Sequence, residues 1–159
     1  MPSILLIAFG NQSRRDDGVA FHIVARLRER LGIPWDFDEL AEDLEHEPAI
    51  ICLHQLAPEL AETLQQYESV VFLDAHVPDT NWDLVAWQQI EPALKASMVT
   101  HQLKPTTLLA LCNTLYGRCP QSYTLSVVGY DFDFGEELSA DTSRLADQAV
   151  DLLQQFIER

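Results

Sequence analysis

Residues 3–20 of the chain read SILLIAFGNQSRRDDGVA, and this stretch decides the fold class. Its first part, residues 3–9, is a continuous apolar run that ends at Gly10-Asn11, as expected for a strand buried on both faces and followed by a tight turn. From Asp17 to Leu31 the apolar residues recur at helical spacing. A buried strand, a polar loop and an amphipathic helix in this order are typical of a βαβ unit, which predicts a parallel sheet.

The rest of the chain continues the alternation of strands and helices. We expect strands at 49–53, 70–73, 84–90 (at an edge) and 123–128, and helices at 58–67, at 103–115 and from Ser139 onward. The segment 36–47 carries seven acids, and we interpret it as a solvated linker or a frayed helical turn. The predicted architecture is a three-layer α/β fold, with a mostly parallel, twisted sheet of about five strands and helices on both faces.

Length and charge narrow the classes of function. The chain has 159 residues, which we interpret as a single domain over 1–159. Ten Lys and Arg against 25 Asp and Glu give a net charge of -15, which would repel phosphate groups. We therefore expect neither nucleic acid nor a membrane surface as a partner. No apolar run approaches the roughly 20 residues that a membrane helix needs.

The cysteines and the N-terminal residues indicate a reducing compartment. Cys52, Cys112 and Cys119 form no C-x-x-C pair, which argues against a disulfide framework and against a zinc knuckle. The chain begins without a basic region, and its first apolar run is too short for a signal peptide. We expect a cytoplasmic protein.

Polar residues that directly follow apolar strands are the candidates for chemistry, because ligands of open α/β sheets bind beyond the carboxyl ends of the strands. Four segments qualify: 10–18, 54–55, 74–76 and 131–137. The first turn reads A-F-G-N-Q-S and lacks the G-x-G-x-x-G of dinucleotide-binding proteins. A Walker loop and a G-x-S-x-G nucleophile elbow are also missing from the sequence.

The remaining candidates are acidic and imidazole side chains. Asp16, Asp17 and Asp74 follow strands, with His76 and His101 as nearby nitrogen donors. Two carboxylates and one imidazole can hold a divalent metal with open positions for water or substrate. Their spacing matches no local ligand motif. The alternative is structural, with Asp16 as the N-cap of a helix, Asp17 as a charge at its N-terminus and Asp74 bonded to backbone amides.

Four motifs in the same order carry a resemblance that covers nearly the whole chain. LLIAFGNQSRRDDGVA resembles an apolar strand followed by G-x-G-N and D-[DE]-G, and FLDAHVPD resembles a strand that runs into D-A. VTHQLKPTTLLAL resembles a histidine before an apolar helix, and VVGYDFDFGEELS resembles the strand and loop before a last helix. Together they resemble the nickel-iron hydrogenase maturation endopeptidases.

The resemblance implies an endopeptidase that removes the C-terminal extension from the precursor of a hydrogenase large subunit once nickel has been inserted. It places the three metal-binding side chains, for nickel or another divalent ion, on Asp17, Asp74 and His101. The ligand is the second acid of D-[DE]-G, so Asp17 is preferred over Asp16. The resemblance also implies Asp17 and Asp74 as catalytic residues, and we expect a monomer.

The sequence departs from the family pattern at several positions. Ala8 replaces the first glycine of G-x-G-N, which we expect to be tolerated unless its φ is positive, and Ala20 replaces another glycine. The stretch 54–60 (HQLAPEL) stands where many members have a glycine-rich turn. Together with FDFGEEL, it is similar to the branch that processes cytoplasmic bidirectional hydrogenases.

Several mechanistic alternatives stay open. A bound metal could polarise the scissile carbonyl or activate water, or the nickel could belong to the precursor and be probed by the three ligands. Asp16 or Asp74 could act as general base. The candidates for substrate contact are Asn11, Asp16, His54 and Asp133.

Two arginines, a further histidine and two other classes of function are also compatible with the sequence. Arg14 and Arg15 could contact a carboxylate of the precursor, and His76 is either a rival metal ligand or an anchor of its loop. A non-catalytic assembly factor that docks on a metalloenzyme precursor is the alternative function. A hydrolase with two carboxylates and no metal is a third.

Overall fold

The computed structural model describes residues 2–35, 42–79, 81–94 and 103–159. Within these residues the strands form one six-stranded sheet in the order β2-β3-β1-β4-β6-β5. β1, β3, β4 and β6 are parallel, whereas β2 and β5 pair antiparallel at the two edges. The strands are β1 Ile4–Phe9, β2 Glu42–Asp43, β3 Ala49–Leu53, β4 Ser69–His76, β5 Val85–Ile90 and β6 Gln121–Val128.

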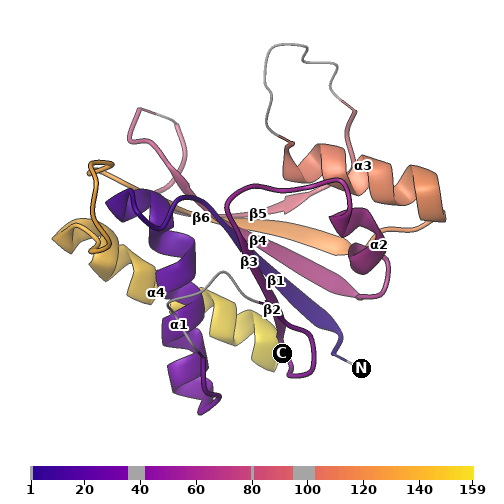
Figure 1. Ribbon diagram of the computed structural model, residues 1–159, viewed down its shortest axis with the longest axis horizontal. Helices are drawn as coiled ribbons and strands as arrows, with labels where there is room; N and C mark the ends of the chain where they lie inside the picture. The colour runs from indigo at the N-terminus through magenta and orange to yellow at the C-terminus, as the bar shows by residue number, and fades with distance from the viewer. Residues whose placement is uncertain (1, 36–41, 80, 95–102) are drawn as a thin grey trace.

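The helices cover both faces of this sheet, as the alternating pattern predicts (Figure 1). α1 (Val19–Leu31) and α4 (Ala140–Glu158) pack together on one face. The short α2 (Leu60–Leu64) and α3 (Pro105–Tyr116) lie on the other face. A 3-10 turn, η1 (Arg15–Gly18), joins the loop after β1 to α1. The three-layer α/β prediction is confirmed.

The apolar run in β1 explains why the sheet is buried on both sides. Leu6 and Ala8 belong to the core beneath α1 and α4, and Leu5 and Ile7 belong to the core beneath α2 and α3. All four are fully buried. Because successive strand side chains point to opposite faces, only a continuous apolar run can serve two cores at once.

Several boundaries differ from those predicted. β4 extends to His76, so Asp74 lies within this strand rather than after it. The predicted helix at 58–67 is helical only over Leu60–Leu64. Ser139 is the N-cap of α4, as predicted, and its side chain accepts a hydrogen bond from Thr142 N. Ala8 lies in β1 and its φ is not positive, so alanine is accommodated there.

The acidic segment is not simply a solvated linker where the structure describes it. Asp43 lies in β2 and accepts a 2.9 Å hydrogen bond from Arg28, whose side chain is fully buried in α1. Burying a guanidinium is costly unless a charge partner comes with it. β2 therefore adds a sixth strand to the five predicted. Its Asp43 supplies the charge partner of the buried Arg28. Residues 36–41 of the predicted linker lie outside the described residues.

Among the described residues, no helix has both the length and the apolar composition needed to cross a membrane.

Candidate functional site

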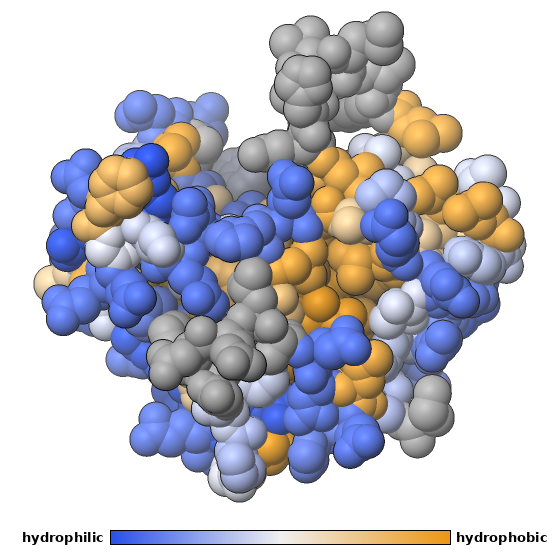
Figure 2. Space-filling model, viewed as in Figure 1, coloured by the Kyte–Doolittle hydropathy of each residue, from blue (hydrophilic) through white to orange (hydrophobic). Residues whose placement is uncertain are grey.

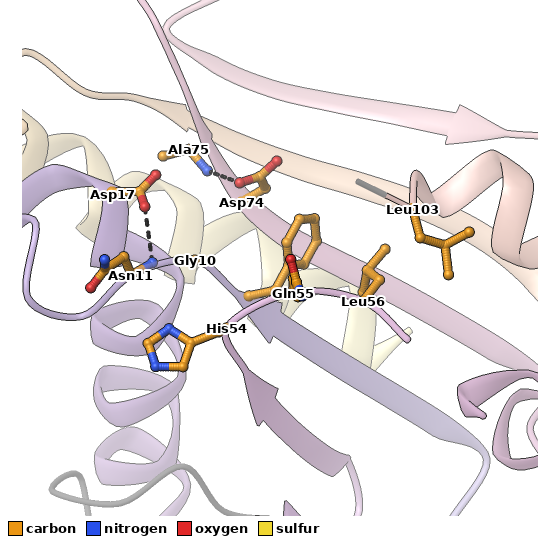
Figure 3. A pocket seen from close by; sticks show the side chains of 10 residues that line it. Gly10, Asn11, Asp17, His54, Gln55, Leu56, Asp74, Ala75 and Leu103 are labelled. Atoms are coloured by element: carbon orange, nitrogen blue, oxygen red, sulfur yellow. Dashed lines mark hydrogen bonds between the residues drawn. The ribbon is translucent and has the colours of Figure 1, made fainter. Parts of the chain in front are cut away.

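A cavity of about 470 Å³ opens at the carboxyl ends of β1 and β3 and beside the end of β4 (Figure 3). Figure 3 shows Asn11 and Asp17 at one end, Leu56 and Leu103 at the other, and Asp74 between them. The sequence-predicted residues Asn11, Asp17, His54 and Asp74 thus come together from three separate segments. The lining residues are Phe9, Gly10, Asn11, Asp17, His54, Gln55, Leu56, Asp74, Ala75 and Leu103.

Gly10 lets the loop after β1 fold tightly against η1. Its φ is +143°, and a Cβ built there would lie only 2.3 Å from the carbonyl oxygen of Asp17. Because a side chain would clash, glycine is required at this close approach. The fold of the loop allows the Asn11 N–H to donate a 2.9 Å hydrogen bond to Asp17 Oδ2. The Asp17 carboxylate is thereby held at the wall of the cavity.

Asp74 reaches the same cavity from β4. Its Oδ1 accepts a 2.7 Å hydrogen bond from the Ala75 N–H. Burial raises the pKa of Asp74 to about 7, against the opposing effect of the Ala75 amide and with a further rise from the negative charge of Asp17. A carboxyl group with a pKa near 7 can both accept and donate a proton at neutral pH, which is the property required of a general acid or base.

Asp16 has a different role from the one predicted. Its carboxylate is fully buried and accepts five hydrogen bonds, which come from Tyr130 N, Asp131 N, Ser139 N, Ser139 Oγ and Thr142 Oγ1. Burial acts to raise the pKa of Asp16, but these hydrogen bonds outweigh it and lower the pKa. The predictions that Asp16 contacts the substrate or acts as the general base are wrong, because protein donors away from the cavity occupy both of its carboxylate oxygens.

The N-cap alternative for Asp16 is also wrong. Gly18 occupies the N-cap of α1, and no side chain caps this end of the helix. Asp16 instead connects the loop after β1 to the loop 129–139 and to the first turn of α4.

Asp133 and His76 lie outside the cavity lining. Asp133 is exposed on the loop 129–139, where its N–H donates to Asp131 Oδ1 at 3.0 Å. A contact between Asp133 and the substrate stays a prediction, and such a contact would lie on the outer surface rather than in the cavity.

His76 is buried, with Nδ1 2.8 Å from Ser126 Oγ and its ring 5.2 Å from the ring of Trp82. These contacts favour the interpretation of His76 as a structural anchor.

The third predicted metal ligand, His101, lies outside the described residues. In the described ranges, no three His, Cys, Asp or Glu side chains form a group that could hold a metal ion. Asp17 Oδ1 and Asp74 Oδ2 accept no hydrogen bond from any residue that the structure describes. These two carboxylate oxygens suit a divalent cation, because hard cations prefer oxygen ligands. Further ligands would be needed to complete the coordination shell of the cation.

Sequence reasoning missed the apolar half of the cavity. Phe9, Leu56 and Leu103 line it; Phe9 ends β1, and the other two lie in loops. The available signal was their position: Leu56 lies in the loop between β3 and α2, and Leu103 lies two residues before Pro105 at the start of α3. This half of the cavity can accommodate an apolar side chain beside the two carboxylates.

Comparisons with known proteins support the fold. No family model and no curated protein matches the chain. Several solved structures do match over nearly the whole chain. The hydrogenase maturating endopeptidase HybD from E. coli has a TM-score of 0.67 at 15% identity and covers 99% of this chain and 93% of its own.

Two archaeal structures are similar to the same extent. The [NiFe] hydrogenase maturation protease HycI from Thermococcus kodakarensis has a TM-score of 0.65 at 17% identity, over 98% of this chain and 92% of its own. The hydrogenase 2 maturation peptidase from a Thaumarchaeota archaeon has a TM-score of 0.61 at 20% identity, and the match covers 98% of this chain and 97% of that structure's chain. At such identities the likeness concerns the fold, and it confirms the fold expected from the four motifs.

Proposed function

We propose that this protein is an endopeptidase that removes the C-terminal extension from the large-subunit precursor of a nickel-iron hydrogenase after nickel insertion. One observation carries the proposal. Asp17 and Asp74 come from two separate motifs that resemble the maturation endopeptidases, and both line one cavity. The fold around them is that of solved maturation proteases.

The cavity supplies the groups that peptide-bond hydrolysis needs. Its volume of about 470 Å³ lies in the range of ligand-binding pockets, so a short segment of the precursor can enter it. Asp74, with a pKa near 7, accepts a proton from the attacking water and returns it to the nitrogen of the leaving peptide. Asp17, held by the Asn11 amide, adds a second negative charge that favours the protonated form of Asp74.

The same carboxylates would hold a divalent cation if one belongs to the protein. Asp17 and Asp74 would be two of its ligands, and His101 is the third ligand that the motif resemblance implies. A divalent ion bound there would polarise the scissile carbonyl and lower the pKa of a water molecule. If nickel belongs to the precursor instead, it is part of the substrate, and the two carboxylates contact it as the cleaved segment enters.

A cytoplasmic location, a monomeric state and a substrate from the bidirectional hydrogenase branch complete the proposal. These three features come from the sequence alone.

The principal experiment follows the mass of the precursor. Nickel-loaded and nickel-free large-subunit precursors are incubated with the wild type, with Asp17→Ala and with Asp151→Ala, which removes an exposed carboxylate of α4 outside the cavity. We expect loss of a C-terminal peptide from the loaded precursor alone, with the wild type and Asp151→Ala but not with Asp17→Ala. Tight binding without a change in mass would instead support the assembly factor.

A second experiment separates metal-dependent hydrolysis from hydrolysis by two carboxylates alone. The wild type is treated with a chelator before the loaded precursor is added, and His101→Ala is assayed beside it. A resident metal predicts loss of cleavage in both samples and recovery of the wild type when Ni²⁺ is restored. Unchanged cleavage in both samples would leave the two carboxylates as the whole catalytic apparatus.

A further inference from the structure

The most exposed aromatic side chain of the described residues lies beside an arginine without an acidic partner. Phe134 is 79% exposed, and the guanidinium carbon of Arg14 lies 4.1 Å from the centre of its ring. In the part of the chain that the structure describes, Arg14 forms no ion pair. Five other arginines are each paired with an aspartate: Arg15, Arg26, Arg28, Arg30 and Arg144. Among the described residues, Arg118 and Arg159 also lack an acidic partner, but Arg118 donates to Tyr67 O and Arg159 lies over the ring of Phe156.

The loop that carries Phe134 is fixed by its backbone. Arg15 N–H donates to Gly135 O, and Gly135 N–H donates to Ser13 O, both at 2.9 Å. Asp16 anchors the rest of the loop through the five hydrogen bonds described above. Arg15 has a φ of +46°, a conformation that non-glycine residues rarely adopt, and such strain persists only where the surroundings enforce it. The exposure of Phe134 is therefore built into the fold.

This pair is connected to the cavity through the loop after β1. Arg14 lies on the same loop as Asn11 and Asp17, which line the cavity, and Asp17 N–H donates to Arg14 O at 3.0 Å. Figure 2 shows an isolated hydrophobic projection among hydrophilic side chains over the loop before α4. One loop thus carries both a residue of the pair, Arg14, and two residues of the cavity lining, Asn11 and Asp17.

Further exposed apolar side chains continue from this loop along the carboxyl edge of the sheet. Tyr130 is 46% exposed and directly follows Gly129, whose N–H donates to His76 O at the end of β4. Leu84 is also exposed, and its carbonyl accepts a 2.9 Å hydrogen bond from Val128 N at the end of β6. Tyr130 and Leu84 thus lie where β4 and β6 end and β5 begins.

We propose that the Arg14–Phe134 pair is a docking contact for the folded body of the protein substrate, outside the segment that is cleaved. This inference rests on the proposed function. The ring of Phe134 enters an apolar depression of the substrate, and the Arg14 guanidinium pairs with a carboxylate beside that depression. Aromatic residues, phenylalanine included, and arginine are enriched in protein interfaces relative to the rest of the surface. We assign a carboxylate to the substrate because Arg14 is a cation beside a loop whose exposed charged side chains Asp133, Glu136 and Glu137 are acidic, so a substrate carboxylate is attracted at Arg14 and repelled by the rest of this loop.

The test measures binding and cleavage of the nickel-loaded precursor by Phe134→Ala and by Arg14→Gln. Matched controls are Leu115→Ala, at an exposed apolar residue of α3, and Arg144→Gln, at an exposed arginine of α4. We expect the Kd of each docking variant to rise about tenfold or more, with a larger change in KM than in kcat and no change in Tm. Binding by Arg14→Gln should also depend less on salt concentration than binding by the wild type.

Two results would overturn the inference while the proposed function stands. The first is that the wild type cleaves the precursor while the Kd of each docking variant stays within about twofold of the wild-type Kd. The other is an equal loss of binding in the two controls. If the wild type neither binds nor cleaves the loaded precursor, the proposed function is wrong, and so is the docking inference that rests on it.

Discussion

Asp16 and Asp17 are adjacent in the chain but lie in opposite surroundings. Asp16 is fully buried, with five protein donors on its carboxylate, whereas Asp17 accepts one hydrogen bond from the described residues and lines the cavity. Both lie in η1, where three residues complete one turn, so successive side chains point about 120° apart. Two identical side chains therefore serve different purposes, one organising loops and the other available for chemistry.

The comparison predicts that Asp17→Asn removes activity and leaves the fold intact. Because the proposed function places Asp17 in the chemistry at the cavity, we expect cleavage of the precursor to fall about 10²- to 10⁴-fold, as for other groups that act in proton transfer. The variant should unfold at nearly the same denaturant concentration as the wild type, since only the Asn11 amide loses a charged acceptor. Cleavage rates and urea unfolding measure the two properties. Retained cleavage would exclude Asp17 from the chemistry.

Asp16→Asn should have the opposite profile. The amide group of asparagine would place N–H donors against the backbone donors of Tyr130, Asp131 or Ser139. We expect the free energy of unfolding to fall by about 3 kcal/mol, as for a buried charged group that loses its partners. Urea unfolding followed by tryptophan fluorescence measures this loss.

The pH dependence gives this prediction a second readout. Because the folded state lowers the pKa of Asp16, its stabilisation is present above the ordinary pKa of about 3.9 and is lost as the pH falls through the folded value. The difference between the wild type and Asp16→Asn should therefore shrink in acid. A difference below about 1 kcal/mol at neutral pH would show that the hydrogen bonds to Asp16 contribute little.

Asp74→Asn should stabilise the metal-free protein, by less than the free energy of unfolding that Asp16→Asn is expected to lose. The pKa of Asp74 is about 7 in the folded protein and about 3.9 in an unfolded chain, so the folded state binds the proton more tightly. The stability of the wild type should therefore decline as pH rises from about 4 to about 7 and then level off. We expect the variant to gain on the order of 2 kcal/mol at pH 8, less than the full shift implies because the side chain is only partly buried.

This gain should disappear towards pH 4. Thermal unfolding of both proteins in the presence of a chelator, from pH 4 to pH 8, measures it. Identical curves for the two proteins would mean that Asp74 ionises in its ordinary range and lacks the proton affinity needed of a general base at neutral pH.

Most of the fold and half of the site could be predicted from local sequence. The apolar runs of β1 and β4 indicated buried parallel strands, and the position of β5 at an edge was predicted correctly. Asp17 and Asp74 were among the candidates because carboxyl ends of parallel strands meet at one edge of a sheet, and Asp17 was preferred over Asp16 only because of the motif resemblance. Asp16 was assigned wrongly, because its donors lie 114 to 126 residues away in the sequence.

The sequence by itself determined the layer order and which strand ends carry acids, because apolar periodicity and strand direction are local properties. Only the tertiary structure decided which acid lines the cavity, since that depends on the rotation of η1 and on donors from the loop 129–139. It also decided that Asp43 pairs with the buried Arg28 and that Phe134 stands exposed beside Arg14. These outcomes depend on contacts between distant segments, and no local pattern of residues encodes such contacts.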